Sequence, residues 1–440
     1  MIGTLARGLF LALCTLVALP ALAAVDIQEV KSEGGITAWL VEEHSIPFVA
    51  LELRFRGGAA LDAPGKRGAI NLMTGLIEEG AADMDARAFA EARESLAASF
   101  RFDVHDDSMM ISAKFLTENR DEAVELLRKA LIEPRFDPDA IERVRAQVLS
   151  IIKSNASDPG KIASTTFNHL AWGDHPYGTD LNGTPESVAA LTRDDLVAAK
   201  NRVMARDRLY VGVVGDITAE ELGPLLDHLL GALPATGAPM PERATYQLKP
   251  GVTVVPWDSP QSIAIFGHEG IKLEDPDYFA AYVLNEAVGG GNFSSRLMDE
   301  VREKRGLTYG IGSYLAPMDL GELIVGQFAS ANGKMAEALD VVRSVWTRVA
   351  EEGLTETELA DAKTYLTGAY PLRFDGNGTI AGIIVGMQMA GFPIDYAATR
   401  NDKIEAVTME DIKRVAKRLY RPEDLAFVVV GKPEGVESDH

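Results

Sequence analysis

An internal repeat places the strongest constraint on what this chain can fold into. The segment from Thr192 to Gly215 reads TRDDLVAAKNRVMARDRLYVGVVG, and the segment from Thr408 to Gly431 reads TMEDIKRVAKRLYRPEDLAFVVVG. The two align without a gap at an offset of 216 residues (408 − 192). In each, a threonine with an aspartate three positions later resembles a helix capping box, and an apolar, β-branched run ends at glycine. The chain therefore contains the same helix, turn and buried strand twice.

The similarity between the two parts of the chain extends upstream of this repeat. PESVAALT at 185–192 parallels NDKIEAVT at 401–408, and the helical stretch 121–130 parallels 336–345. Each part opens with strand-like runs and continues with helices. A chain of 440 residues is also longer than one core usually supports. We predict an α+β protein of two homologous halves, each a mainly antiparallel sheet backed by helices.

The boundary between the halves is expected at a proline-containing segment. Residues 231–248, GALPATGAPMPERATYQL, hold three prolines and little periodicity, which is typical of an extended linker. The expected domains are therefore 24–230 and 249–435, with a signal peptide at 1–23.

The signal peptide is predicted from the first residues. Arg7 is the only charge before Asp26, and an almost unbroken apolar run from Gly8 to Leu22 ends in Ala-Leu-Ala. About 15 apolar residues are too few for a membrane span, which takes about 20. We expect a secreted, periplasmic protein with no membrane contact after cleavage. The only cysteine, Cys14, leaves with the signal, so neither disulfides nor thiolate metal sites are expected. The net charge of −22 argues against nucleic-acid or anionic-membrane binding.

Two longer motifs resemble those of one protein family. GGGNFSSRLMDEVREKRGLTYGIGSYL at 289–315 closely resembles the C-terminal-domain signature of the pitrilysin/insulinase family of zinc peptidases. HPYGTDLNGTPESVAALTRDDL at 175–196 resembles the stretch that follows the catalytic elements in that family. The resemblance covers roughly residues 27 to 435. It implies a two-domain chain that forms half of a clam-shell, with two such chains enclosing a peptide chamber.

The resemblance also indicates where a zinc site would lie, and its ligands are absent from this sequence. Family members carry H-x-x-E-H on the first long helix, with two zinc-binding histidines, a glutamate as general base and a distant glutamate as third ligand. In GAINLMTGLIEEGA at 68–81, the three positions hold Asn71, Thr74 and Gly75. The third-ligand region reads ERVRAQVLSII, with Ser150 and Ile151 in place of two glutamates. We therefore expect no cofactor in this chain.

Other residues offer no obvious replacement site. No two histidines are three or four residues apart, the spacing that places two imidazoles on one helical face; the histidines are His44, His105, His169, His175, His228, His268 and His440. Glu78 and Glu79 form a carboxylate pair near a helix end, where a solvated face is one interpretation and an acid–base role the other. The glycine triplet at 289–291 lacks the Lys-Ser/Thr pair of a P-loop, so a flexible turn between two helices is expected.

One pair of family residues is present. In REKRGLTY, Arg302 and Tyr309 occupy the positions of the arginine–tyrosine pair that the family's C-terminal domain directs at the substrate. Peptide hydrolysis develops negative charge on the carbonyl oxygen, and a guanidinium and a phenol are suitable donors to it. The structural alternative is an arginine in a surface ion pair with Glu300 or Glu303, and a tyrosine packed on a strand edge.

The resemblance thus implies a chain with substrate-binding donors but without zinc. We interpret it as the non-zinc subunit of a heterodimeric periplasmic metallopeptidase, inactive alone. Its partners would be a homologous zinc-bearing peptidase subunit, which holds the zinc, and the peptide substrate. The alternative is a non-catalytic binding or scaffold protein that kept the peptidase fold, and a homodimer also stays open.

Overall fold

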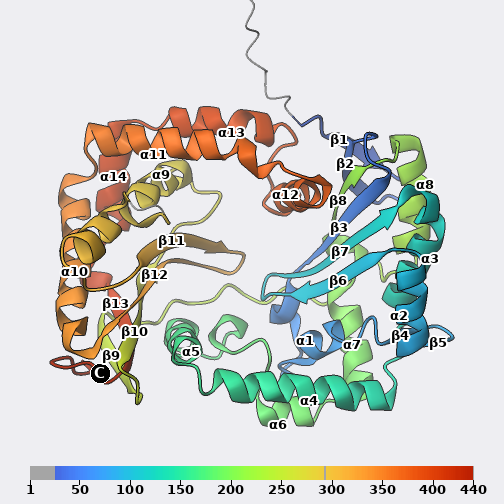
Figure 1. Cartoon of the computed structure of the whole chain (residues 1–440), viewed down its shortest axis with the longest axis horizontal. Coiled ribbons are helices and arrows are strands. Elements are labelled where there is room, and N and C mark those ends of the chain that lie inside the picture. Colours follow the sequence, from blue (N-terminus) through green and yellow to red (C-terminus); the bar gives the residue numbers. More distant parts are fainter. Residues whose placement is uncertain (1–24, 292–293, 440) are drawn as a thin grey trace, which may run out of the picture.

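Figure 1 shows the computed structural model, which describes residues 25–291 and 294–439. The predicted signal peptide at 1–23 and His440 lie outside these ranges. We call residues 25–230 the first half and residues 249–435 the second half. The two sheets stand on opposite sides of the molecule, each with most of its helices on the outer side (Figure 1). No helix in the described ranges has the length and apolar character of a membrane span.

The two sheets share one strand topology. In the first half the order is β1 (Gln28–Lys31), β2 (Thr37–Glu42), β8 (Leu209–Gly215), β3 (Phe48–Arg56), β7 (Ser108–Leu116) and β6 (Ser99–Val104). In the second half, read from the other edge, it is β9 (Gly251–Pro256), β13 (Ala426–Gly431), β10 (Gln261–Glu269), β12 (Gly321–Ala331) and β11 (Ile311–Met318).

The repeated strands β8 and β13 occupy equivalent places in these sheets. β8 pairs in parallel with β2 and antiparallel with β3, and β13 pairs in parallel with β9 and antiparallel with β10. The remaining pairings are antiparallel. The predicted fold class is confirmed: two similar α+β halves, each with a mainly antiparallel sheet that contains one parallel pair.

The helices follow a similar order in both halves, except that α8 has no counterpart after β13 in the described residues. The first half contains α1 (Ala69–Thr74), α2 (Ala86–Ser95), α3 (Arg120–Ile132), α4 (Pro138–Asn155), α5 (Pro159–Trp172), α6 (Pro185–Ala189), α7 (Arg193–Val203) and α8 (Ala219–Leu230), with a small β4–β5 ribbon (Gly80–Ala81 and Met84–Asp85). The second half contains α9 (Tyr278–Gly289), the π-helical turn η5 (Met298–Glu303), α10 (Met335–Glu352), α11 (Glu356–Ala369), α12 (Asn377–Met389), α13 (Tyr396–Glu405) and α14 (Met409–Leu419). Both capping boxes that the repeat predicts are formed, at the starts of α7 and α14.

Two equivalent helices are exchanged between the halves. α5 of the first half packs on β10 and β13 of the second, and α12 of the second half packs on β3 and β8 of the first. Figure 1 shows each of them on the inner side of the other half's sheet. Phe167 of α5 belongs to a buried apolar cluster with Ile265 and Val428, whereas Ile384 of α12 clusters with Val214. Each sheet is therefore covered on its inner face by a helix from the other half.

The contact between α12 and β8 depends on a glycine. A Cβ atom on Gly212 would lie 2.6 Å from the carbonyl oxygen of Ala381 in α12, which is backbone and cannot rotate away. Gly212→Ala is expected to destabilise the protein by about 1–3 kcal/mol, because overpacking forces α12 off the sheet. The free energy of unfolding in urea measures this effect.

The control for this substitution lies on α12 itself. A Cβ atom on Gly382 would meet no atom within 4 Å. Gly382→Ala is expected to stabilise the protein by roughly 0.5–1 kcal/mol, since alanine is the better helix former. Equal effects of the two alanine substitutions would contradict this account of the contact.

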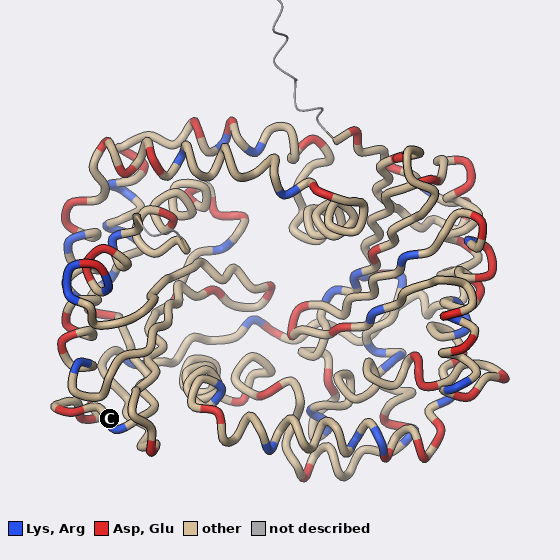
Figure 2. The backbone as a smooth tube through the Cα atoms, in the orientation of Figure 1, with Lys and Arg blue, Asp and Glu red and all other residues tan. Residues whose placement is uncertain are grey.

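The segment predicted as a linker contains no helix or strand from 231 to 248. It is held to both halves by backbone hydrogen bonds, from Gln247 to the Ala171 carbonyl at 2.9 Å and from Ala244 to the Leu320 carbonyl at 2.8 Å. The excess of acidic residues is spread over both halves rather than gathered on one face in the view of Figure 2.

Candidate functional site

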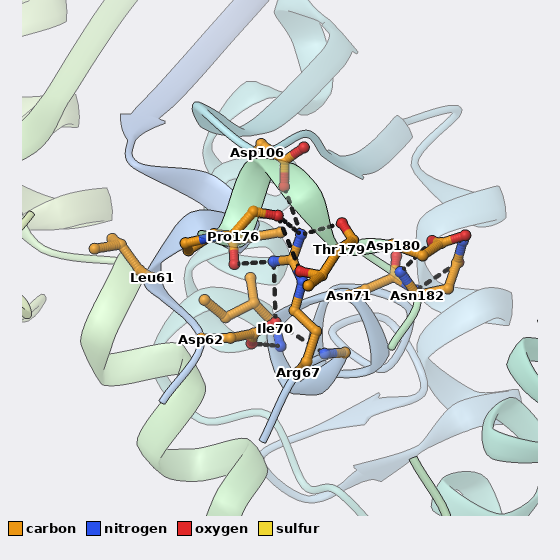
Figure 3. Close-up of polar contacts among 12 residues, drawn as sticks. Leu61, Asp62, Arg67, Ile70, Asn71, Asp106, Pro176, Thr179, Asp180 and Asn182 are labelled. Atoms are coloured by element: carbon orange, nitrogen blue, oxygen red, sulfur yellow. Dashed lines mark hydrogen bonds and ion pairs between the residues drawn. The ribbon is translucent and has the colours of Figure 1, made fainter. Parts of the chain in front are cut away.

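The helix that would carry the zinc motif is short. α1 ends at Thr74, and Gly75 is its C-cap residue. The Asn71 side-chain amide donates to Asn182 Oδ1 at 3.1 Å (Figure 3). Thr74 is buried, and its hydroxyl donates to the carbonyl oxygen of Ile70 at 2.7 Å. The first two motif positions therefore hold side chains engaged in local hydrogen bonds, and the third has no side chain.

The third-ligand positions lie on α4, which packs against α1. Both Ser150 and Ile151 are exposed, and neither offers a carboxylate. Within residues 25–291 and 294–439, no group of three or more His, Cys, Asp or Glu side chains could hold a metal ion.

A polar network around Arg67 occupies this region. Its guanidinium donates to Asp106 at 2.7 Å and to the carbonyl oxygens of Pro176 and Thr179 at 3.0 and 3.1 Å (Figure 3). It also lies 3.5 Å from Asp62, whose carboxylate accepts two backbone N–H groups at the start of α1, each at 2.8 Å. Burial raises the pKa of both carboxyls, and the Arg67 charge opposes that rise. The network ties the 176–182 loop to α1, which is a structural role.

The paired carboxylates of the sequence are also engaged in ion pairs. Glu78 pairs with Arg93, and Glu79 pairs with Arg143. This arrangement favours the interpretation of a charged surface over an acid–base role.

Four of the described histidines have separate partners. His44 contacts Asp216 at 2.8 Å, His228 contacts Glu125 at 2.8 Å, and His175 contacts the Glu242 carbonyl at 3.1 Å. His268 is fully buried and accepts a hydrogen bond from Trp346 at 3.1 Å. Burial lowers the His268 pKa to about 4, so this ring is neutral and belongs to the core.

The structure brings Arg302 and Tyr309 together. The Arg302 guanidinium carbon is 5.2 Å from the centroid of the Tyr309 ring, within cation–π range. Arg302 Nε also lies 3.4 Å from the Glu303 carboxylate, so the ion pair considered from the sequence is present as well. Tyr309 is 90% exposed, which is unlike a tyrosine packed on a strand edge. An aromatic ring stacked on arginine and otherwise in solvent is available to a ligand.

The segment that carries this pair is anchored on both sides. Leu307 is buried, and its N–H donates to the carbonyl oxygen of Val301 at 2.9 Å. The Thr308 hydroxyl donates to the carbonyl oxygen of Ala329 in β12 at 2.7 Å. These contacts hold the chain on either side of Gly306 and place Tyr309 immediately before β11.

Gly310, the residue after Tyr309, lines a pocket of about 600 Å³. It is lined by β11 and β12, including Tyr314 and Gln327, and by Gly289 and Gly291. β11 is an edge strand, with β12 as its one neighbour among the strands of the described residues. Tyr314 was not predicted as a site residue, although its place in an alternating strand pattern indicates a side chain that faces away from the core.

The glycine triplet contributes to this pocket by close packing. A Cβ atom on Gly289 would lie 2.0 Å from the Ser313 hydroxyl, so glycine allows the end of α9 to contact β11. The triplet was predicted as a turn between two helices; Gly289 is the last residue of α9, and the next helical element with given bounds is η5, which begins at Met298. Residues 292 and 293 are outside the described ranges.

Polar contacts join the two halves at the turn between β11 and β12. Asp107, in the turn between β6 and β7, accepts hydrogen bonds from the Tyr177 hydroxyl and from the Asp319 N–H, the latter at 3.2 Å. The Tyr177 oxygen in turn accepts the Leu320 N–H at 2.9 Å. We call these four residues the Asp107 clasp. Burial raises the pKa of Asp107 to about 6; the Tyr177 hydrogen bond opposes this rise, and the Asp319 and Asp106 charges add to it.

Two models of known protein families match this chain. Residues 38–185 match the model for "Insulinase (Peptidase family M16)", and residues 190–366 match the model for "Peptidase M16 inactive domain". The chain belongs to peptidase family M16. The resemblance to the pitrilysin/insulinase peptidases is thereby confirmed.

Relatives in family M16 carry different names. The chain is 27% identical over 391 residues to "Non-peptidase homolog YmxG" of Helicobacter pylori, covering 88% of this chain and 90% of that protein. It is 22% identical over 420 residues to "Uncharacterized zinc protease YmxG" of Bacillus subtilis, covering 93% of this chain and 99% of that one.

Among solved structures, the peptidase M16 inactive domain from Pseudomonas fluorescens is similar at a TM-score of 0.87 and 27% identity, covering 94% of this chain and 99% of that one. A protease from Helicobacter pylori is similar at a TM-score of 0.83 and 16% identity, covering 92% and 99%, which shows the shared fold.

Proposed function

We propose that this chain is the non-zinc subunit of a heterodimeric, periplasmic family M16 peptidase. Arg302 and Tyr309 would act across the interface on a peptide that the zinc of a homologous partner polarises. The observation that carries this proposal is the stacked pair with its exposed Tyr309, next in sequence to the pocket residue Gly310, in a chain whose zinc-motif positions hold Asn71, Thr74 and Gly75.

Peptide binding would use the edge of the second sheet. An edge strand offers unpaired backbone groups to an extended chain, and the pocket beside β11 is lined by Gly310, the neighbour of Tyr309 in the sequence. A carbonyl oxygen that becomes negative during hydrolysis would be stabilised by the guanidinium and the phenolic O–H. Names of relatives such as "Non-peptidase homolog YmxG" support a chain without its own peptidase activity.

The second candidate is a scaffold or peptide-binding protein that takes no part in hydrolysis. The Arg302–Glu303 ion pair favours it, because that contact gives the arginine a structural role. The exposed Tyr309 hydroxyl favours the peptidase subunit, since a scaffold gains nothing from it.

The isolated chain, without its signal, is expected to hold no stoichiometric zinc and to hydrolyse no peptide. No other described group replaces the missing ligands. Elemental analysis of the purified chain and an assay with quenched peptides measure both properties. One tightly held zinc per chain would contradict the assignment.

The partner is identified by co-purification from the native host's periplasmic fraction. A zinc-bearing M16 chain of similar size is expected to co-purify, and peptide hydrolysis should require both chains. The scaffold candidate would be favoured if this chain is recovered alone from an intact periplasmic extract and the zinc-bearing chain is fully active without it.

A further inference from the structure

A pocket in the second half shares no lining residue with the one beside Tyr309. It has a volume of about 280 Å³ and lies between α9, α12, α13 and the turn after α11. Six aromatic side chains line it: Tyr278, Phe279, Tyr282, Tyr370, Phe392 and Tyr396. Phe392 and Tyr396 stack with centroids 3.9 Å apart, and Tyr278 stacks on Tyr282 at 6.4 Å. Flat apolar walls of this kind suit a ring or a branched apolar group.

A buried charge without a carboxylate partner lies in the wall. Arg400 is only 5% exposed, and its guanidinium carbon is 4.4 Å from the Tyr370 ring centroid and 5.7 Å from that of Tyr282. It donates to the Leu366 carbonyl at 2.8 Å and to Asn401 Oδ1 at 3.0 Å. No carboxylate of the described residues lies within ion-pair distance of it. A buried charge is ordinarily paired, so this one leaves the pocket with an uncompensated positive charge.

A second guanidinium and several phenols add donors. Arg373 lines the same pocket, is exposed, and makes no ion pair with any described residue. The hydroxyls of Tyr278, Tyr282, Tyr370 and Tyr396 have no hydrogen-bond partner among the described residues. Burial raises the pKa of Tyr278 to about 12 and raises that of Tyr370 and Tyr396, so these groups keep their protons.

The lining contains no aspartate or glutamate, although the chain carries a net charge of −22. A cationic ligand would meet the charges of Arg373 and Arg400 and is disfavoured. A neutral aromatic ligand would leave the Arg400 charge uncompensated. A ligand with an anionic group on an aromatic ring can accept hydrogen bonds from these donors and pack its ring against the aromatic walls.

We propose that this pocket binds a carboxylate carried on an aromatic group, held by Arg373, Arg400 and the phenolic hydroxyls. The carboxylate can belong to the C-terminal residue of a peptide or to a free aromatic acid. The site requires neither a partner subunit nor zinc, so it goes beyond the proposed peptidase function and is tested separately from it.

The test is calorimetric titration of the isolated chain at neutral pH. N-acetyl-L-phenylalanine is expected to bind, and N-acetyl-L-phenylalaninamide to bind at least about ten-fold more weakly because it lacks the charge. Arg373→Gln should weaken binding of the acid by about ten-fold or more without changing the melting temperature, since Arg373 is exposed. Arg87→Gln, at an exposed arginine of the first half, is the matched control and should leave Kd unchanged.

Two further probes distinguish the sources of the carboxylate. If acetyl-Ala-Ala-Phe binds more tightly than 3-phenylpropionate, the site is assigned to the C-terminal ends of peptides. If the two bind equally, it is assigned to free aromatic acids. Both results support the proposal. Three results would overturn it: no binding of any acid at millimolar concentration, equal binding of acid and amide, or an unchanged Kd in Arg373→Gln. None of them depends on whether a zinc-bearing partner is found.

Discussion

Tyr309→Phe is expected to lower the turnover of the assembled peptidase by about 100- to 1000-fold, the usual cost of removing one oxyanion donor. The substitution removes only the hydroxyl of a side chain that is 90% exposed, so assembly and the partner's zinc content should not change. Arg302→Ala should lower turnover similarly and also raise KM, because a guanidinium can hold the substrate in the ground state as well. The measurement is hydrolysis of a quenched peptide by the variant mixed with the zinc-bearing subunit.

The controls for this prediction are matched by residue type. Tyr365→Phe removes a hydroxyl from a half-exposed tyrosine on α11, and Arg87→Ala removes an exposed arginine on α2. Both should retain nearly full turnover. Glu303 is unsuitable as a control because it pairs with Arg302 at 3.4 Å. Full activity of a correctly assembled Arg302→Ala, Tyr309→Phe double variant would make this chain a scaffold.

The Asp107 clasp is expected to make stability depend on pH. Burial raises the folded-state pKa of Asp107 from 3.8 to about 6, so the folded protein holds this proton more tightly than the unfolded chain. The stabilisation is fully present below about pH 4 and is lost as the pH rises through about 6. At 1.36 kcal/mol per pKa unit, the loss is roughly 3 kcal/mol at most.

Asp107→Asn isolates this contribution from those of the other carboxyls. Asparagine does not titrate, so the stability of the variant relative to the native chain should rise by up to roughly 3 kcal/mol between pH 4 and pH 7. Urea unfolding at several pH values measures the difference. Asp83→Asn changes an exposed carboxyl, and its free energy of unfolding should show the same pH dependence as that of the native chain. If the free energy of unfolding of Asp107→Asn also follows the pH dependence of the native chain, Asp107 does not bind its proton more tightly in the folded protein than in the unfolded chain.

The sequence predicted the repeated units better than their assembly. The ungapped match between 192–215 and 408–431 predicted that β8 and β13 occupy equivalent places, and their pairings show this. The apolar face of a helix does not by itself indicate which sheet it covers. The exchange of α5 and α12 between halves was therefore not predictable from local patterns.

In the candidate site too, features within one continuous motif were predictable and contacts between distant segments were not. Arg302 and Tyr309 were identified within one continuous motif, and the turn at Gly306 brings them into contact. The clasp was missed because Asp107 is 70 residues from Tyr177 and 212 from Asp319, and no local pattern links them. The aromatic pocket was missed for the same reason, since its walls come from four separate segments.

The exchanged helices also determine the order in which the chain can fold. α5 leaves the ribosome long before β13, at residues 426–431, the strand it must cover. Until that strand forms, the buried cluster that contains Phe167 lacks its second-half members such as Val428, and the inner face of the first sheet is not yet covered by α12. Contacts this distant in sequence form slowly and leave apolar surface exposed to aggregation in the meantime. A newly made chain should therefore depend on a chaperone until its last strand is in place, and a chain truncated after the first half should continue to depend on one.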